Sequence, residues 1–197
     1  MAVSKETIVE ASLKILNRDG IENLSMRTIA KELGIKAASL YWHVSGKQEL
    51  YGEIAEAMCS RMILPEDSGD VKTYLLEIHH AFRTTLLTTK DSVPIFENSI
   101  PNTPRRMEII KAVINGLLRM GIQEKNCLTA SNMINNYVLS FVADEVRIKS
   151  RTSEEIAAFV SLFGLIDNMN MFVQKDFDEQ FLYGLQVLFA GLDAVEE

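Results

Sequence analysis

Apolar residues recur every three or four positions along most of the chain, which is the period of a helix with one buried face. The first such segment begins after Ser4, a good N-cap, and ends near Gly20, which suits the C-terminal position of a helix. The alternation of apolar and polar residues that is typical of half-buried strands is not found. The pattern therefore predicts an all-α fold.

Prolines and polar stretches divide this helical pattern into further segments. Pro65 and the polar residues 66–69 interrupt it most clearly, so we predict a domain boundary there, with domains at 1–64 and 65–197. Three prolines break residues 90–104 into short pieces. The longer predicted helices are 45–62, 70–87, 104–121, 123–149 and 178–195, and a further helical segment begins at Ser153.

The sequence of residues 25–47 predicts two short helices joined by a tight turn. Ser25 is the N-cap of the first helix, Gly34 supplies a left-handed turn residue, and Ala37 to His43 form the second helix. A helix pair joined in this way can place its second helix in the major groove of DNA. Ser45, followed three residues later by Gln48, predicts a capping box that opens the next helix.

The distribution of charge changes this picture only in part. The chain has 20 Lys and Arg against 27 Asp and Glu, and an evenly spread net charge of −7 would repel phosphates. Residues 25–47 carry four basic side chains and one acidic one, Glu32, so this segment is +3 and the remaining chain is −10. Charge alone leaves DNA binding and an ordinary solvated surface equally open. The helix-turn-helix pattern favours DNA binding.

Other functional classes find little support in the sequence. No apolar run is long enough to span a bilayer and the N-terminus lacks the apolar core of a signal peptide, so we expect a cytoplasmic protein. Cys59 and Cys127 each lie in a helical pattern and are expected to be core residues rather than a disulfide. His79 and His80 are neighbours that point about 100° apart on a helix. Because catalytic, phosphate-binding and metal-binding motifs are also missing, we expect no enzyme, no cofactor and no metal.

The segment 25–47 also resembles the TetR family of transcriptional repressors. The resemblance is carried by Arg27-Thr28-Ile29-Ala30, by Leu33-Gly34-Ile35, and by Leu40-Tyr41-Trp42-His43-Val44 followed by Lys47. Near the C-terminus, residues 181–185 and 190–192 are similar to the last helix of the tetracycline-repressor subgroup. The resemblance implies a ligand-responsive repressor with a helix-turn-helix DNA-binding head on a larger helical ligand-binding and dimerisation domain. A helical protein-binding scaffold without regulated DNA binding is the alternative.

Candidate DNA contacts follow from helix geometry and from the resemblance. Leu40 and Val44 lie four residues apart and are expected to seat the second helix on the core. The resemblance implies base contacts from Arg27 and residues 36–38, and phosphate contacts from Ser39, Tyr41, His43 and Lys47. Core packing is the alternative for the two adjacent aromatic residues. The candidate DNA-binding residues are Ser25, Arg27, Lys36, Ala37, Ala38, Ser39, Tyr41, Trp42, His43 and Lys47.

The segment 123–149 carries a polar line beside an apolar line. Asn132, Asn136, Ser140 and Asp144 recur at four-residue intervals, which places them on one side of a helix. This side either faces solvent or forms a pocket wall, in which amides orient a mostly apolar ligand against aromatic side chains. The candidate ligand-binding residues are Phe82, Phe96, Met107, Asn132, Met133, Asn136, Tyr137 and Ser140.

The match to tetracycline-binding members differs at two positions. Phe96 stands where that subgroup has a metal-binding histidine, and Asn136 stands where it has another histidine that faces the ligand. A complex of tetracycline with magnesium would lose key contacts at both positions. The resemblance therefore implies a different effector, and we expect a predominantly apolar small molecule and assign no metal.

Recognition of a specific operator by so small a head requires two copies of the chain. A two-fold homodimer places two recognition helices about 34 Å apart on a near-palindromic double-stranded DNA operator. The last predicted helix has a wide apolar stripe, with Gly184 and Gly191 available for close helix approach, and the resemblance implies that such helices pair in the dimer. A core within one chain would explain the same stripe. The candidate interface residues are Phe181, Leu185, Leu188, Phe189 and Leu192.

Overall fold

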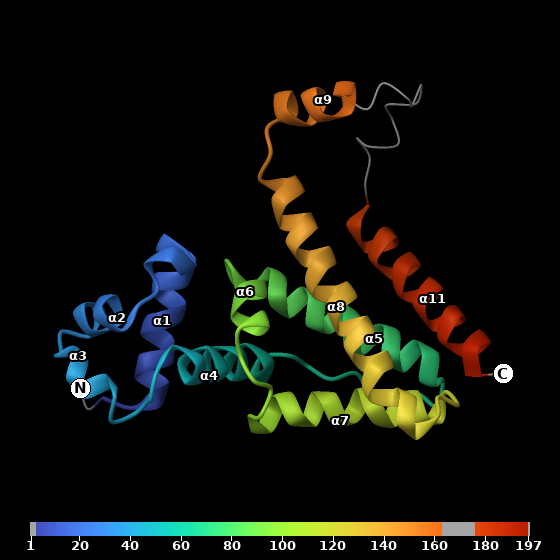
Figure 1. Ribbon diagram of the computed structural model, residues 1–197, viewed down its shortest axis with the longest axis horizontal. Coiled ribbons are helices and arrows are strands. Elements are labelled where there is room, and N and C mark those ends of the chain that lie inside the picture. Colours follow the sequence, from blue (N-terminus) through green and yellow to red (C-terminus); the bar gives the residue numbers. More distant parts are fainter. Residues whose placement is uncertain (1–2, 163–175, 197) are drawn as a thin grey trace.

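The computed structural model describes residues 3–162 and 176–196, and side-chain surroundings are described for 3–158 and 176–196. Every regular element in these ranges is a helix and no strand occurs in them, which confirms the all-α prediction (Figure 1). No helix in the described part of the chain is both long and apolar enough to cross a membrane.

The N-terminal head contains α1 (Lys5–Asp19), the short η1 (Ile21–Asn23), α2 (Met26–Glu32) and α3 (Ala37–Leu40). Ser4 and Ser25 cap α1 and α2, and in each case a threonine three residues later closes a capping box. Gly34 follows α2 with a φ of +67°, the left-handed conformation that glycine adopts without strain. The helix-turn-helix predicted for this segment is therefore confirmed.

Two local predictions for this segment are wrong. The second helix ends at Leu40 instead of His43, and residues 41–43 form a turn in which the N–H groups of His43 and Val44 share the carbonyl of Leu40 as acceptor, at 2.9 and 3.0 Å. The capping box of Ser45 and Gln48 does not form. Glu49 accepts hydrogen bonds from the Ser45 N–H and hydroxyl instead, at 2.7 Å each.

The described part of the body contains α5 (Val71–Leu87), α6 (Ser92–Glu97), α7 (Pro104–Arg119), α8 (Glu124–Lys149), α9 (Ser153–Leu162) and α11 (Phe177–Glu196). The side chain of Asp70 caps α5, Pro104 is the first residue of α7, and Gly121 follows α7 with a φ of +99°. In Figure 1, α8 and α11 stand side by side, and α9 lies beyond the C-terminal end of α8.

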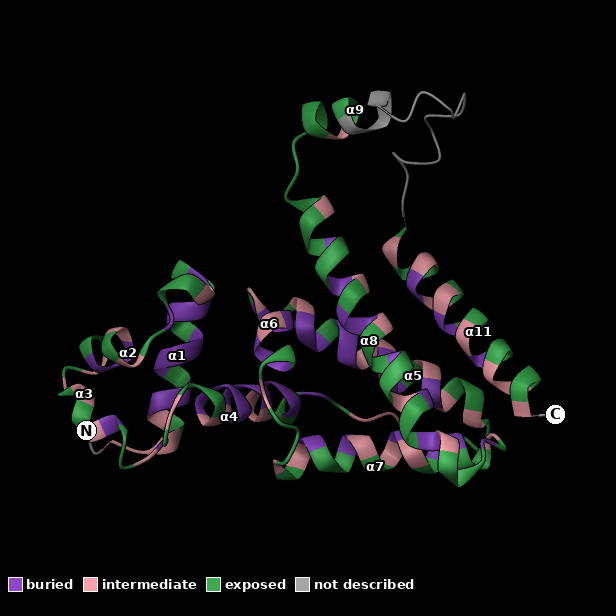
Figure 2. Cartoon of the chain, viewed as in Figure 1, coloured by how far each residue is buried: buried purple, intermediate pink, exposed green. Residues whose placement is uncertain are grey.

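Helix α4 (Lys47–Ser60) joins the head to the body. It packs against α1 on one side and against α5, α6 and α7 on the other. The buried side chains consequently form one continuous core that runs from Ile8 in α1 to Phe189 in α11 (Figure 2). The division at residues 64 and 65 therefore separates two parts that share a core, and it stays a prediction.

The apolar stripe of α11 faces the chain's own core at three of the five predicted interface positions. Phe181, Leu185 and Phe189 are buried within the chain, so their side chains pack in its own core, and a role for them in a dimer seam stays a prediction. Gly184 allows this close packing, because a Cβ atom at this position would overlap the hydroxyl of Tyr137 on α8. Gly191 has no such neighbour. Leu188 and Leu192 are only half-buried and remain available to a partner.

Candidate DNA-binding surface and ligand pocket

The predicted DNA-binding residues lie on the surface of the head. Tyr41 is 55% exposed and Trp42 is 88% exposed, so core packing is the wrong explanation for both side chains. Leu40 and Val44 are buried and fix α3 and its following turn on the core, as predicted. The other exposed candidates are Ser25, Arg27, Lys36, Ala38 and Lys47, and the half-buried ones are Ala37, Ser39 and His43. The segment thus offers basic, hydroxyl and aromatic groups to a phosphate backbone.

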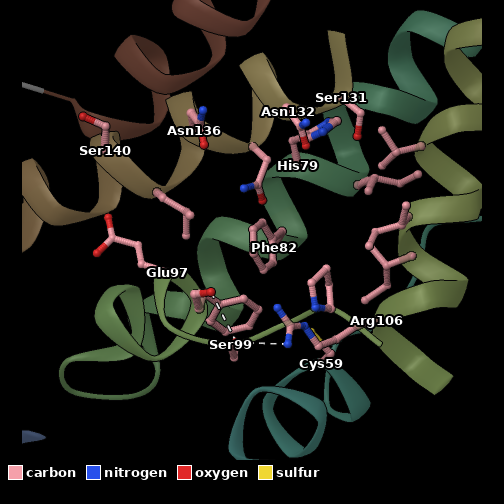
Figure 3. A pocket seen from close by; sticks show the side chains of 18 of the residues that line it. Cys59, His79, Phe82, Glu97, Ser99, Arg106, Ser131, Asn132, Asn136 and Ser140 are labelled. Carbon is pink, nitrogen blue, oxygen red and sulfur yellow. Dashed lines mark hydrogen bonds between the residues drawn. The ribbon is translucent and has the colours of Figure 1, made fainter. Parts of the chain in front are cut away.

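A cavity of about 770 Å³ lies in the body between α5, α6, α7 and α8 (Figure 3). Its volume falls within the range of roughly 300–1,000 Å³ that is usual for small-molecule sites. Phe82 and Phe96 form part of its wall in an edge-to-face pair, with ring centroids 5.2 Å apart. The predicted ligand-binding residues that line the cavity are Phe82, Phe96, Asn132, Asn136 and Ser140.

Three predicted ligand-binding residues do not line the cavity. Met107 directly follows Arg106, which lines the cavity. Because successive side chains on a helix point about 100° apart, Met107 points away from the cavity and is exposed. Met133 is displaced in the same way from Asn132 and is also exposed. Tyr137 turns toward α11, where its ring stacks on Phe181 and its hydroxyl donates to the Phe181 carbonyl at 3.0 Å. The apolar line of α8 therefore faces away from the cavity.

Several residues that line the cavity were not predicted from the sequence. They come mainly from α5, the loop after α6, α7 and, in the largest number, α8. On α7, the apolar lining positions repeat at helical spacing after Arg106. That spacing could have revealed Arg106 from the sequence. Apolar residues three, four and seven positions after an arginine on a helix lie on the same face as the arginine, so they indicate that its side chain points toward the interior. The unpredicted lining residues include Cys59, Ile78, His79, Ser99, Arg106, Ile109, Ile110, Val113, Leu128, Ser131, Asn135 and Leu139.

Arg106 is the buried charged residue at the closed end of the cavity, whereas the other charged lining residues, Glu97, Asp144 and Arg147, are exposed. The side chain of Arg106 is buried, with only 6% of the residue exposed, and its guanidinium lies over the ring of Phe96 at 5.1 Å. Nη1 donates to the Ser99 hydroxyl and to the Ile100 carbonyl, both at 3.0 Å. Burial lowers the pKa of Arg106 from its usual range, against smaller opposing effects of nearby Cys59 and Glu56.

His79 and Cys59 contribute uncharged groups to the same cavity. Burial lowers the pKa of His79 to about 4, so the imidazole is neutral near pH 7. Nδ1 lies 2.6 Å from the carbonyl of Leu75, which can only accept, so Nδ1 carries the proton and Nε2 is an acceptor. Burial raises the pKa of the Cys59 thiol to about 12, and a thiol that stays protonated is a poor nucleophile.

The α8 wall of the cavity differs from the closed end. Asn132, Asn135, Asn136 and Ser140 are exposed, so this wall combines amides and a hydroxyl with access to solvent. Figure 3 shows Asn132, Asn136 and Ser140 along one side, Arg106 with Ser99 and Cys59 at the other, and Phe82 between them. A bound molecule would therefore contact aromatic rings in its middle and polar groups at both ends.

A helix-turn-helix head joined through one helix to a helical body with an internal cavity defines a DNA-binding regulatory protein. Two family models cover most of the chain: residues 8–54 match bacterial regulatory proteins of the tetR family, and residues 64–196 match the tetracyclin repressor-like C-terminal domain. The chain belongs to the tetR family.

Individual relatives resemble the chain over nearly its full length. The tetracycline repressor protein class G of Vibrio anguillarum is 28% identical over 97% of this chain and 94% of the relative. A TetR variant from Acinetobacter baumannii AYE, solved in complex with minocycline, is 26% identical with a TM-score of 0.77, over 100% of this chain and 99% of the other. BioQ, solved with its double-stranded DNA operator, is 28% identical with a TM-score of 0.75, over 98% and 99% of the two chains.

Proposed function

We propose that the protein is a transcriptional repressor that binds a near-palindromic operator as a homodimer and leaves it when a mostly apolar small molecule fills the cavity. The observation that carries this proposal is the course of α4. Lys47 at its first residue belongs to the candidate DNA-binding surface, and Cys59 near its last residue lines the cavity. A change of shape in the cavity can therefore move the helix that holds the head.

The comparisons support both halves of the proposal. BioQ was solved with an operator, and the TetR variant was solved with minocycline, so relatives of this length and fold bind DNA and a small molecule. In this chain, Phe96 stands in the cavity wall, and a phenyl ring offers no ligand to a metal ion. We therefore propose an effector other than a tetracycline–magnesium complex, held by aromatic rings and by the amides of α8.

Homodimerisation is part of the proposal, with an interface that differs from the predicted one. Tyr183 and Val187 on α11 are exposed and lie four residues apart, so they share one side of this helix. Met133 on α8 is also exposed, four residues before Tyr137, which packs against α11. Exposed apolar groups gathered on neighbouring helices mark contact surfaces. We assign the interface to this face of α8 and α11, with Leu188 and Leu192 at its edge.

The cellular setting and the organisation follow from the same proposal. A regulator of this family acts where the chromosome lies, so we propose a cytoplasmic protein whose residues 1–64 bind DNA and whose residues 65–197 bind the effector and the second copy. The described site groups carry no nucleophile activated by a base, and catalysis forms no part of the proposed function.

Selection of bound sequences from random double-stranded DNA, followed by titration at several salt concentrations, tests the proposal. We expect a near-palindromic site whose binding constant falls steeply with salt, because phosphate contacts release counterions. A ligand found by thermal-shift screening should then weaken operator binding, and operator should weaken ligand binding by the same factor. Absence of DNA binding at low salt would favour a protein-binding scaffold, and ligand affinity unchanged by saturating operator would contradict the switch.

A further inference from the structure

We propose that the effector carries a carboxylate and that Arg106 binds it at the closed end of the cavity. This inference rests on the proposed ligand-binding role of the cavity and adds the chemical class of the ligand. It assigns a specificity-determining role to a residue that has no contact with the DNA-binding surface.

The donors of Arg106 are only partly used in the structure. A guanidinium has five N–H donors, and the two on Nη1 are directed to the Ser99 hydroxyl and the Ile100 carbonyl. Within the described part of the chain, Nε and Nη2 of Arg106 have no hydrogen-bond acceptor. These two nitrogens form the planar edge that binds both oxygens of a carboxylate.

The charge of Arg106 also lacks a partner nearby. No carboxylate among the described residues lies within 4.0 Å of this guanidinium. Glu56 is close, but its carboxylate accepts the backbone N–H groups of Arg105 at 2.8 Å and Arg106 at 3.2 Å. A buried cation without a counterion is expensive, so an anion that enters the cavity would gain both charge pairing and hydrogen bonds.

The other walls restrict the rest of the molecule. The edge-to-face rings of Phe82 and Phe96 beside Arg106 suit a flat aromatic body. His79 offers an unprotonated Nε2 as an acceptor, which suits a hydroxyl donor on that body. A carboxylate matches this apolar surrounding better than a phosphate, because a second negative charge would have to be desolvated against a single guanidinium.

A second arginine provides a matched control. Arg147 also lines the cavity, on the α8 wall, but its guanidinium pairs with Asp144 and 61% of its side chain is exposed. Its charge is therefore already neutralised and solvated, and it should add little to the binding of an anion. Arg106 and Arg147 thus differ in burial and pairing while they share residue type and cavity.

The test compares anthracene-2-carboxylate with anthracene-2-carboxamide as fluorescent probes at pH 7.5, where the acid is ionised. We expect the wild-type protein to bind the carboxylate about tenfold or more tightly than the amide, as a charge-assisted bidentate contact implies. Arg106→Met should remove this preference, Arg106→Lys should restore part of it, and Arg147→Met should retain it. Circular dichroism of each variant checks that it is folded.

Two results would overturn the inference. Equal affinity of the wild-type protein for acid and amide would exclude a carboxylate site, and a preference that survives in folded Arg106→Met would place the anion elsewhere. Titration of the same proteins with operator DNA, in the absence of the probes, distinguishes failure of the carboxylate site from failure of the proposed repressor function. A wild-type protein that binds operator but shows no acid preference refutes only the ligand class, whereas a protein that shows the preference without binding DNA refutes the repressor.

Discussion

His79 links a single buried side chain to the pH dependence of stability. Its Nδ1–H donates to the Leu75 carbonyl, and the ring lies edge-on to Phe189 with centroids 6.2 Å apart, so the imidazole is buried and its charged form is disfavoured by desolvation. With a folded pKa of about 4, the ring stays neutral in the folded chain, whereas in the unfolded chain it titrates near 6.5. Below pH 6.5 the unfolded state therefore binds a proton that the folded state does not.

We predict that the free energy of unfolding falls as pH is lowered from about 6.5 to about 4, by about 1.4 kcal/mol per unit and about 3 kcal/mol in total. Above pH 6.5 the contribution of His79 is fully present, and below pH 4 it levels off. Urea unfolding at pH 7.5, 6.5, 5.5 and 4.5 measures the free energy of unfolding across this range. The variant His79→Gln should show a shallower slope in this window, and equal slopes would exclude His79 as the cause. Hydrogen bonds from Ser45 lower the pKa of Glu49 from 4.5 to about 2, so the stability that this carboxylate contributes is lost mainly below pH 4.5.

The surface of the head supports a second prediction at this scale. Tyr41→Ala and Lys47→Ala should weaken binding to all DNA sequences about equally, because these exposed side chains are assigned to phosphates. Arg27→Ala should change base preference and cost roughly 1–3 kcal/mol at the base pair it contacts. Fluorescence anisotropy with operator and scrambled DNA distinguishes the two effects. Lys111→Ala, an exposed lysine on α7 in the body, serves as the control, and unchanged binding in both Tyr41→Ala and Lys47→Ala would refute the assignment.

Single residues also show where prediction from the sequence stops. Most of the candidate DNA-binding positions of the head are exposed, as the simple period of a surface helix indicates, and the roles that the resemblance supplied for them stay predictions. Arg106 was missed, because arginine is seldom buried and only the folded chain brings Phe96 of α6 and Ser99 of the following loop around it. Met133 was assigned to the wrong face, because the sequence does not tell which side of α8 meets α11.

At the scale of elements, α4 and α7 cap each other. Glu56 on α4 accepts the first free N–H groups of α7, at Arg105 and Arg106, where the side chain of Thr103 makes no capping bond. In return, Arg105 donates to the carbonyls of Cys59 at 3.4 Å and Met62 at 2.7 Å, at the end of α4. The helix that holds the head is therefore fastened to the helix that carries Arg106.

We predict that Glu56→Ala lowers the free energy of unfolding by about 1–2 kcal/mol, the usual value of an N-cap. It should also speed hydrogen exchange of the Arg105 and Arg106 amides, because these groups lose their acceptor. Glu108→Ala is the control, since Glu108 contacts Arg105 only at the surface, with 58% of its side chain exposed. Exchange that is equally fast in both variants would show that the carboxylate of Glu56 does not hold the two helices together.

Helix boundaries were largely predictable because their signals are local. Ser4, Ser25, Asp70 and Pro104 mark starts that agree with the structure to within a residue, and each acts through its own backbone neighbours. The capping of α4 was not predictable in the same way. Glu49 is also held by Lys5 of α1, 3.1 Å away, and this contact between distant segments helps to select Glu49 over Gln48 as the partner of Ser45.

The whole molecule presents an apolar surface that one chain leaves uncovered. Phe181, Leu185 and Phe189 were assigned to this surface from the sequence, although a helix stripe looks the same whether it meets its own chain or a second copy. With these three side chains buried by α5 and α8, the surface consists of their neighbours around the helix, chiefly Tyr183 and Val187. Only the packed structure separates the two faces of α11.

The last prediction concerns this surface. Val187→Glu should convert the dimer to a folded monomer, because a charge in the centre of an apolar interface would be desolvated without a partner, whereas in the single chain Val187 is 52% exposed. Sedimentation velocity measures the mass, and circular dichroism checks the helices. Ile63→Glu is the matched control, since Ile63 is 84% exposed but lies beside the end of α4, and it should remain dimeric.

Operator binding extends this prediction from assembly to function. Two heads held in one dimer bind the second half-site at a high effective concentration, so a monomer should lose this advantage while it retains contact with a single half-site. Val187→Glu should therefore bind full operator and an isolated half-site with similar affinity, whereas the wild-type protein and Ile63→Glu should strongly prefer the full operator. A folded Val187→Glu protein that sediments as a dimer and keeps this preference would place the interface on a different surface from Tyr183 and Val187.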